Sequence, residues 1–275
     1  MRFNSRSARL AGAAVAAVLA IGLSACSATP ATSASGVKSI GTVNVGALAT
    51  PAGDILKFVS DNLAADAGLT INVTEFTDYN TPNTALSQGA VDANLFQNAT
   101  FLKTYNDASK DTLVSVGEVY LPTAAFYSTK VTSLDELKDG AKIAIPNDPT
   151  NEGRALKILA SKDLITVKDN PTVLGDITAN PHNFDFVEVE NATLAQTLPD
   201  VDTAFVTISF ALPAKLTAKE AILVEPSDAP YYNVLATTAA LKDDPRIAAL
   251  YKLLLDPKTK AYIEDTWGGL VVPVS

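Results

Sequence analysis

The chain has 275 residues, 47% of them hydrophobic, and carries 30 acidic against 21 basic side chains, which gives a formal net charge of −9. This length can bury a large core and is commonly divided between two lobes. The acidic balance excludes the basic footprint of a nucleic-acid-binding protein. It also argues against electrostatic adhesion to an anionic membrane surface.

Residues 1–25 have the pattern of a secretory signal peptide. Arg2, Arg6 and Arg9 precede an apolar run over residues 10–23, which is too short to predict a membrane span. The run ends in Leu-Ser-Ala-Cys, and Cys26 is the single cysteine of the sequence. This ending resembles the bacterial lipobox, in which the cysteine becomes the lipidated first residue of the mature protein. A lone exported thiol would be a liability, so acylation, palmitate included, explains Cys26 better than ordinary cleavage that leaves a free thiol.

Residues 26–40 are predicted to form the lipidated cysteine and a flexible tether, because residues 27–38 are small and polar. Loss of the signal removes three of the 21 basic residues and makes the net charge −12. Two or more acyl chains hold a protein stably on a bilayer. We therefore expect an exported protein, lipid-anchored at the cell membrane on its extracytoplasmic side. No second long apolar run follows, so the chain itself is not predicted to form a channel.

The folded part is predicted to open with a βαβ unit. Residues 42–47 read as a strand, Thr50 as the cap of a helix with Pro51 at its first position, and residues 69–76 as an alternating second strand. Such a unit is right-handed and begins a parallel sheet.

A second group of elements follows. A short helix over 82–88 precedes a strand over 91–96, whose end delivers Phe96, Gln97 and Asn98 to a loop. A helix is expected next, with Phe101 and Tyr105 on one face. Core packing is the simpler reading of these two rings, more so for Tyr105, since Phe101 stands just past a strand end.

The remaining elements form a second α/β pattern. Extended segments over 113–120 and 124–128 precede a short helix over 133–137, in which Ser133 and Glu136 suit a capping box. Strands and helices then alternate, and this alternation predicts an α/β fold built from two units. The predicted strands are 143–145, 184–189, 203–206, 221–225 and 232–237, and the predicted helices are 153–162, 192–198, 245–255 and 257–267.

The stretch over 141–156 carries the strongest indication of a site. A strand is stopped by Pro146, a polar turn follows over 147–151, and a helix is predicted to open near Gly153. In an open α/β sheet a small anionic ligand lies beyond the carboxyl end of a strand. Arg154 would lie in the first helical turn, where the helix dipole does not favour a cation, so a bound anion is one reason for it. The alternative is a surface arginine with a solvated head.

Six segments, in the same order, resemble the methionine-binding lipoprotein family (NlpA/MetQ), the substrate-binding subunits of amino-acid ABC importers. They are FTDY at 76–79, PNTAL at 82–86, GAVDANLFQ at 89–97, SLDEL at 133–137, NDPTNEGRAL at 147–156 and PYYN at 230–233. The resemblance implies a periplasmic-binding-protein-like fold, in which each of two lobes is a mostly parallel sheet flanked by helices. It places the ligand cleft between the lobes, with 41–126 and 226–275 forming lobe 1 and 127–225 forming lobe 2.

The resemblance also implies the residues of the ligand site. Arg154 would pair with the ligand's carboxylate in a planar, bidentate geometry. The other implied positions are Asn151 and Asn233 as polar contacts, Phe76 and Tyr79 as wall residues, and Asn98, Phe101 and Thr207 as further pocket residues. The last three depart from the family, which commonly has histidine, tyrosine and asparagine at these positions.

The sequence offers little for catalysis. Its single histidine, His182, lies in a turn-rich segment where a solvated side chain is expected, and no nucleophile elbow, metal-ligand spacing or phosphate-binding glycine loop is present. Asp78 and Asp92 are the best candidate catalytic carboxylates, but both are better explained as acceptors for backbone amides of loops. No catalytic residue, metal or cofactor is predicted.

These observations predict a monomeric, lipid-anchored solute-binding protein that captures methionine or a related apolar amino acid. It would deliver this ligand to the permease and ATPase subunits of an ABC transporter, and it would bind no nucleic acid. Two alternatives stay open from the residues alone, namely a secreted carboxylate-dependent hydrolase and a surface lipoprotein whose partner is another protein.

Overall fold

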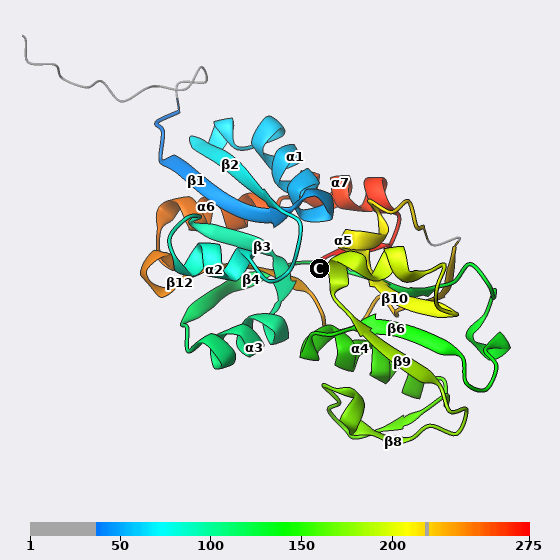
Figure 1. Cartoon of the computed structure of the whole chain (residues 1–275). Coiled ribbons are helices and arrows are strands. Elements are labelled where there is room, and N and C mark those ends of the chain that lie inside the picture. The colour runs from blue at the N-terminus through cyan, green and yellow to red at the C-terminus, as the bar shows by residue number, and fades with distance from the viewer. Residues whose placement is uncertain (1–36, 218–219) are drawn as a thin grey trace, which may run out of the picture. The chain divides into compact units, whose positions relative to one another are not determined.

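The computed structural model describes residues 37–217 and 220–275, which form two main β-sheets flanked by helices (Figure 1). The predicted signal peptide, Cys26 and the tether up to residue 36 lie outside these residues. The last part of the predicted tether already joins the fold, because the amide of Ile40 donates to the carbonyl of Gly68 at 2.8 Å. Within the described residues, no helix has both the length and the apolar character needed to cross a membrane.

The first sheet has six strands in the order β13-β4-β12-β3-β1-β2 in the described part of the chain. β1 pairs in parallel with β2 and β3, which confirms the predicted βαβ unit, whereas β12 lies antiparallel between β3 and β4. The C-terminal strands thus return to the sheet that the N-terminal strands begin. The strands are β1 (Gly41–Leu48), β2 (Leu69–Phe76), β3 (Ala93–Asn98), β4 (Leu113–Pro122), β12 (Asn233–Thr238) and β13 (Val271–Pro273).

The second sheet has five strands among the described residues, in the order β11-β5-β10-β6-β9. β6 pairs in parallel with β9 and β10, while β5 is antiparallel to β10 and β11. Its strands are β5 (Ala124–Tyr127), β6 (Lys142–Pro146), β9 (Asp185–Val189), β10 (Thr203–Thr207) and β11 (Ala221–Val224). A separate pair, β7 (Thr166–Val167) and β8 (Ile177–Ala179), was not predicted, because segments this short show no periodicity.

We call the first sheet with its helices lobe 1 and the second sheet with its helices lobe 2. The chain crosses between the sheets at Thr123 and again between β11 and β12. The predicted lobe boundary after residue 126 is wrong, because it cuts through β5, which pairs with β10 in the second sheet. The predicted boundary after residue 225 falls within the second crossover.

Helices flank both sheets. Several begin with proline at the first or second position after an aspartate cap, as α6 and α7 do, and this pattern made them predictable. The α-helices are α1 (Asp54–Asn62), α2 (Pro82–Ser87), α3 (Ala99–Ser109), α4 (Pro149–Ala160), α5 (Ile208–Ala211), α6 (Pro245–Leu254) and α7 (Pro257–Trp267). Shorter helical turns are η1 (Ala49–Gly53), η2 (Ala65–Ala67), η3 (Leu134–Glu136), η4 (Leu174–Asp176), η5 (Asn191–Thr197) and η6 (Ala239–Leu241).

Three local predictions were wrong. Thr50 has extended backbone angles, φ −137° and ψ 148°, and α1 begins only at Asp54, so Thr50 does not cap it. The Glu136 carboxylate accepts from the amide of Thr132 and not from that of Ser133, so the predicted capping box is absent. No loop follows β3, because Asn98 is both its last residue and the cap of α3.

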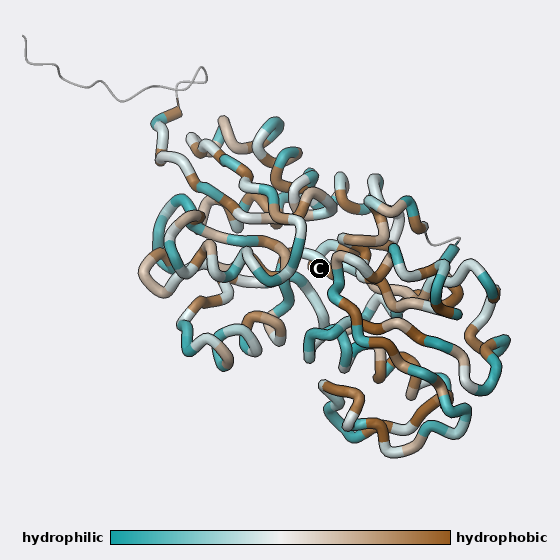
Figure 2. The backbone as a smooth tube through the Cα atoms, in the orientation of Figure 1, coloured by the Kyte–Doolittle hydropathy of each residue, from teal (hydrophilic) through white to brown (hydrophobic). Residues whose placement is uncertain are grey.

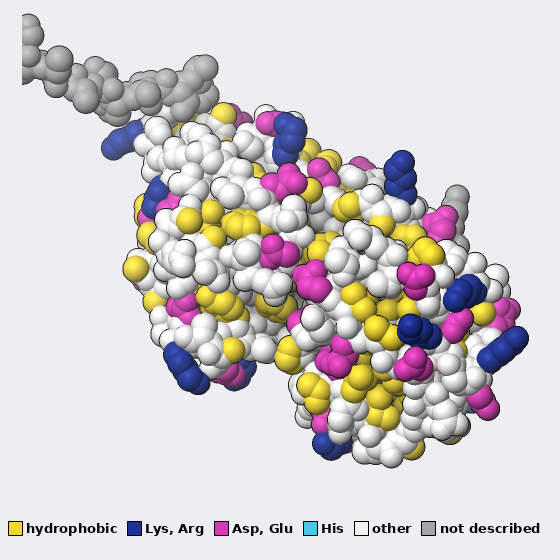
Figure 3. Space-filling view, in the orientation of Figure 1, with side chains coloured by type: hydrophobic (Ala, Val, Ile, Leu, Met, Phe, Trp, Pro, Cys, Tyr) yellow, Lys and Arg dark blue, Asp and Glu magenta, His cyan; other side chains and the backbone are white. Residues whose placement is uncertain are grey.

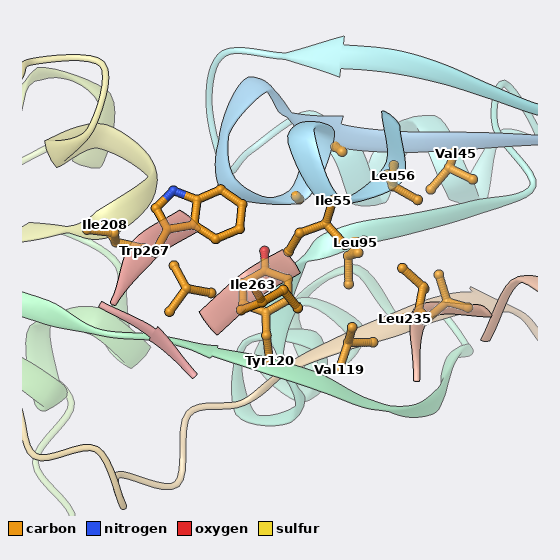
Figure 4. Packing of buried hydrophobic residues seen from close by; sticks show 14 of the residues in the cluster. Val45, Ile55, Leu56, Leu95, Val119, Tyr120, Ile208, Leu235, Ile263 and Trp267 are labelled. Atoms are coloured by element: carbon orange, nitrogen blue, oxygen red, sulfur yellow. The ribbon is translucent and has the colours of Figure 1, made fainter. Parts of the chain in front are cut away.

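The main core joins both lobes. In lobe 1 it includes Ile55, Tyr120 and Ile263, each 0% exposed, and Trp267 packs beside Ile208 of lobe 2 (Figure 4). Burying an aliphatic or aromatic side chain of this size stabilises the fold by about 1.5–3 kcal/mol. The lobes therefore share apolar contacts, and acidic side chains lie over both of them on the face shown in Figure 3.

A second hydrophobic core fixes the position of α4, the helix that carries Asn151 and Arg154. Ile143 of β6 packs with Leu156 and Leu159 of α4, and all three are 0% exposed. Hydrophobic residues run along β6 and β9 in Figure 2. α4 is thereby held against the second sheet, with its N-terminus directly after the carboxyl end of β6.

Candidate ligand-binding site

The helix that carries Arg154 begins earlier than predicted. Asp148 caps α4 by accepting the amide of Asn151 at 2.9 Å, and Pro149 takes the first position. The predicted start near Gly153 is wrong, and Arg154 lies in the second turn. Gly153 serves a close approach instead, because a Cβ there would lie 2.0 Å from the carbonyl oxygen of Pro171.

A small pocket with a cavity volume of about 20 Å³ lies where the two lobes meet. It contains seven of the eight predicted site residues, and sequence reasoning missed Phe96, Gln97 and Pro122 as part of its lining. The lining residues are Tyr79, Phe96, Gln97, Asn98, Phe101, Pro122, Asn151, Arg154, Thr207 and Asn233.

Phe76 is the predicted site residue that the structure leaves out. It ends β2, the edge strand of the first sheet, which is separated by β1 from the pocket-lining strand β3. Its ring packs on Gly46 of β1 instead, where an added Cβ would come within 2.8 Å of Phe76 Cε2. The strand order, which the local sequence does not show, therefore removes Phe76 from the pocket lining.

Arg154 is buried and already paired within the chain. Its side chain is 2% exposed, which excludes a solvated surface arginine. Nε donates to Glu225 Oε1 at 2.6 Å, while Nη2 donates to Glu225 Oε2 and, at 2.8 Å, to the carbonyl of Pro122. The guanidinium also lies 4.6 Å from the ring centroid of Tyr231.

Glu225, which sequence reasoning missed, therefore occupies the planar fork of the guanidinium. The predicted bidentate pairing of Arg154 with a ligand is not available in this geometry. Nη1 makes no hydrogen bond to any residue in the described part of the chain. It is the one nitrogen of this group that remains for a further acceptor.

In each of three asparagine side chains of the lining, one of the two polar atoms of the amide makes a hydrogen bond within the fold. Asn98 Oδ1 accepts the amide of Phe101 at 2.9 Å, Asn151 Nδ2 donates to Asp148, and Asn233 Nδ2 donates to the hydroxyl of Tyr120 at 3.1 Å. The remaining amide atoms are Nδ2 of Asn98 and the Oδ1 atoms of Asn151 and Asn233, and the hydrogen bonds among the described residues do not use them. The pocket lining thus carries one further donor group and two acceptors.

Gln97 behaves differently, because all of its polar atoms are used behind the pocket. Its Nε2 donates to Oδ1 of Asn83 at 2.5 Å and to Oδ1 of Asn94 at 3.0 Å, and its Oε1 accepts from Asn83 at 2.7 Å. We call Asn83, Asn94 and Gln97 the amide network. Its members are at most 3% exposed, and their bonds hold the end of β3 in place.

An aromatic cluster forms the other wall. The ring of Tyr79 lies 5.8 Å from that of Phe96, 6.0 Å from that of Phe101 and 4.9 Å from that of Phe210, measured between centroids. The Tyr79 hydroxyl lies 3.0 Å from Thr207 Oγ1, which links a residue after β2 to the end of β10 in the other sheet. Burial raises the pKa of Tyr79, so its hydroxyl is neutral and can hydrogen-bond at physiological pH.

The candidates for catalysis have structural roles. The side chain of His182 is 40% exposed, as its turn-rich segment predicted, and its Nδ1 lies 3.0 Å from Asp139 Oδ1. Asp78 accepts backbone amides two and three residues along the chain, as predicted for a loop. Asp92 also accepts a backbone amide, but at 2.8 Å from Asn44, which belongs to β1 and not to a loop. Among the described residues, no group of three or more His, Cys, Asp or Glu side chains could hold a metal ion.

Two α/β lobes with a lined pocket at their junction define a periplasmic substrate-binding protein. More particularly, the chain belongs to the NlpA lipoprotein family, whose model matches residues 43–275. These findings confirm the family and the fold class predicted from the sequence.

Named relatives support this assignment. The D-methionine-binding lipoprotein MetQ of Escherichia coli strain K12 is 42% identical over 193 residues, which span 67% of this chain and 71% of that protein. The structure of a nutrient-binding protein from Burkholderia cenocepacia bound to methionine matches with 35% identity and a TM-score of 0.82, over 85% of this chain and 100% of that chain. A periplasmic substrate-binding protein of an ABC transporter from Coxiella burnetii matches with 37% identity and a TM-score of 0.81, over 84% and 100%.

Proposed function

We propose that this protein captures methionine or a related apolar amino acid outside the cytoplasm and delivers it to the permease and ATPase subunits of an ABC transporter. The observation that carries the proposal is a buried arginine with one unused nitrogen, set among amide groups and opposite an aromatic wall. An amino acid needs a cation for its carboxylate, oxygen acceptors for its ammonium and an apolar wall for its side chain. The pocket combines all three.

The polar end of the ligand would lie between Arg154 and three asparagine side chains. Nη1 of Arg154 and Nδ2 of Asn98 would donate to the carboxylate, while the side-chain oxygens of Asn151 and Asn233 would accept from the ammonium. Hydrogen bonds to charged groups contribute about 1.5–3 kcal/mol each, more than bonds between neutral groups. These contacts would therefore supply most of the selectivity for an amino acid over an apolar molecule of the same size.

The side chain of the ligand would lie against Tyr79, Phe96 and Phe101. The cavity of about 20 Å³ has room for about one water molecule, so the lobes would have to separate before an amino acid could enter. Arg154 is the one charged residue of this lining. A carboxylate-dependent hydrolase would need acidic groups there, and no observation favours a protein partner at this pocket.

Ligand capture would couple to closure of the lobes. The link between Tyr79 and Thr207 already joins them, and a bound ligand can add only the free energy of its differential contacts with the closed state. Small-angle scattering should show a smaller radius of gyration with ligand than without. An unchanged radius would instead indicate a rigid, preformed pocket.

Membrane attachment would come from the lipid on Cys26, in an otherwise monomeric protein. Cys26→Ser should then yield an unprocessed or soluble exported protein whose ligand binding is unchanged, because the tether separates the anchor from the fold. Fractionation of cells that express either form provides the measurement. Processing and membrane attachment like those of the parent would refute the anchor.

Binding itself can be tested on the purified protein. Denaturing protein prepared without refolding and analysing the released molecules by mass spectrometry should reveal a stoichiometric amino acid. Titration calorimetry of ligand-stripped protein then ranks four ligands by affinity, namely L-methionine, D-methionine, leucine and L-methioninamide. Amides that bind as tightly as the acids, or no binding by any member of the panel, would contradict the proposed site.

A further inference from the structure

The charge balance of the pocket has an unusual source. Arg154 is the one charged residue in the lining, but Glu225 neutralises it from behind, and both side chains are 2% exposed. Buried charges are costly unless they are paired, and effective Coulomb interactions strengthen away from water. The guanidinium and this carboxylate therefore form a neutral pair, although the pocket lining contains a cation.

We propose that Glu225 is a specificity-determining residue, which makes the pocket select ligands that carry both an ammonium and a carboxylate. This inference rests on the proposed function, in which Arg154 receives the ligand's carboxylate. Glu225 acts through Arg154 and is a positioning residue. It is absent from the pocket lining, and instead borders an outer groove together with Arg154 and Tyr231.

The selection follows from counting charges around one guanidinium. When a carboxylate binds Nη1, Arg154 carries two negative neighbours, and the site has an excess of one negative charge. A ligand ammonium removes this excess, whereas a carboxylate without an ammonium leaves it buried. If Glu225 were neutral, Arg154 would balance a simple carboxylate by itself, and the ammonium of an amino acid would become the unbalanced group.

The fold holds this pair from both crossovers. The amide of Glu225 donates to the carbonyl of Ala124 at 2.9 Å, which ties the second crossover to the start of β5. Pro122, at the first crossover, accepts from Nη2, and Tyr231, in the second, covers the guanidinium. Nη1 is the one guanidinium nitrogen without a hydrogen-bond partner in the described residues, so the ligand's carboxylate would bind the arginine at this atom.

The test compares three ligands of equal length and different charge. They are L-methionine, which is net neutral, its des-amino carboxylate, which is net negative, and L-methioninamide, which is net positive. The parent should bind L-methionine most tightly. Glu225→Gln should raise the affinity for the des-amino carboxylate relative to that for L-methionine by roughly 10- to 100-fold. Glu264→Gln, which removes an exposed carboxylate on α7, should leave this ratio unchanged.

A second pair of variants guards against a failure of Glu225→Gln to fold. Arg154→Gln leaves Glu225 unbalanced, so the affinity for L-methioninamide relative to that for L-methionine should rise by a similar factor. Arg154→Gln combined with Glu225→Gln removes both charges and should return both ratios towards those of the parent. Circular dichroism and thermal unfolding identify the folded variants.

The outcomes separate the inference from the function on which it rests. If Glu225 had a merely structural role, Glu225→Gln would lower the affinity for all three ligands by the same factor. Unchanged affinity ratios in the folded variants would therefore overturn the inference. If the parent binds none of the three ligands, the proposed function itself fails. A change of ratio in the predicted direction in either Glu225→Gln or Arg154→Gln, absent in Glu264→Gln, supports charge selection.

Discussion

Two polar clusters in this protein are buried to the same extent but differ in how many of their hydrogen-bonding atoms have partners. In the amide network of Asn83, Asn94 and Gln97, the side chains bond chiefly to one another, and Gln97 has no donor or acceptor atom left over. The pair of Arg154 and Glu225 is equally buried, yet Nη1 has no partner among the described residues. The first cluster can only stabilise the fold, whereas the second can also receive a ligand. Counting unused donors and acceptors, and not burial, separates the two roles.

The largest expected effect comes from breaking the pair of Arg154 and Glu225. Arg154→Ala leaves Glu225 buried without its partner, which costs roughly 3–5 kcal/mol. Loss of the same cation should weaken amino-acid binding by about two to three and a half powers of ten. Arg154→Lys should recover part of the binding, because an ammonium retains the charge but loses the planar geometry. Calorimetry and urea unfolding measure the two effects, and unchanged affinity in Arg154→Ala would remove the arginine from the site.

Breaking the amide network should reduce stability without changing ligand selectivity. Asn83→Ala removes both partners that it offers to Gln97, and leaving buried groups unpaired costs about 1–3 kcal/mol for each group. We expect the free energy of unfolding to fall by roughly 2–4 kcal/mol in urea titrations. Asn72→Ala, which removes an exposed amide, should change it by less than about 0.5 kcal/mol. A change in ligand ranking for Asn83→Ala would contradict the division between the two clusters.

A buried carboxyl group in α4 differs from both clusters. One of its oxygens has no hydrogen-bond partner among the described residues, as in the ligand site, but the group does not line the pocket. Glu152 is 1% exposed, and its Oε1 has no hydrogen-bond partner among the described residues. Burial raises the pKa of Glu152 to about 7, and the nearby carboxylate of Glu188 adds to the rise. The folded state therefore binds this proton more tightly than the unfolded state does. The stabilisation is fully present below the unfolded pKa of about 4.5 and is lost as the pH rises through about 7.

Glu152→Gln should remove this dependence on pH. We expect the variant to be more stable than the parent at pH 8 by roughly 1–2 kcal/mol, and the difference to shrink at pH 5. Urea unfolding of both proteins at the two pH values provides the measurement. A parent whose stability rises between pH 5 and pH 8 by more than that of the variant would show that the sign is wrong.

The smallest effect concerns the link between the lobes. Thr207→Val keeps the shape of the side chain and removes the oxygen that faces the Tyr79 hydroxyl at 3.0 Å. A net hydrogen bond contributes about 0.5–1.5 kcal/mol, so ligand affinity should fall by roughly 2- to 10-fold if this bond forms only in the closed state. Thr203→Val, which removes a hydroxyl bonded within lobe 2, is the matched control for affinity. Equal losses of affinity in both variants would argue against a role of the link in closure.

Sequence reasoning located elements well where periodicity and caps were strong. The predicted bounds of β2 and α7 match those of the structure, and the βαβ unit is parallel as expected. The start of α4 was missed because Gly153 resembled a helix boundary, although its role is to allow contact with Pro171. β13 was missed because three residues show no alternation.

The sequence by itself determined which chemical groups the pocket could use. The segments NDPTNEGRAL and PYYN place Asn151 and Arg154 in the first turns of α4 and Asn233 at the start of β12. Only the tertiary structure decided how these groups are used. Glu225 lies 71 residues from Arg154 in the chain, and Phe76 is excluded by the order of the strands. Pairing between distant segments leaves no local pattern, because it depends on which surfaces meet when the whole chain packs.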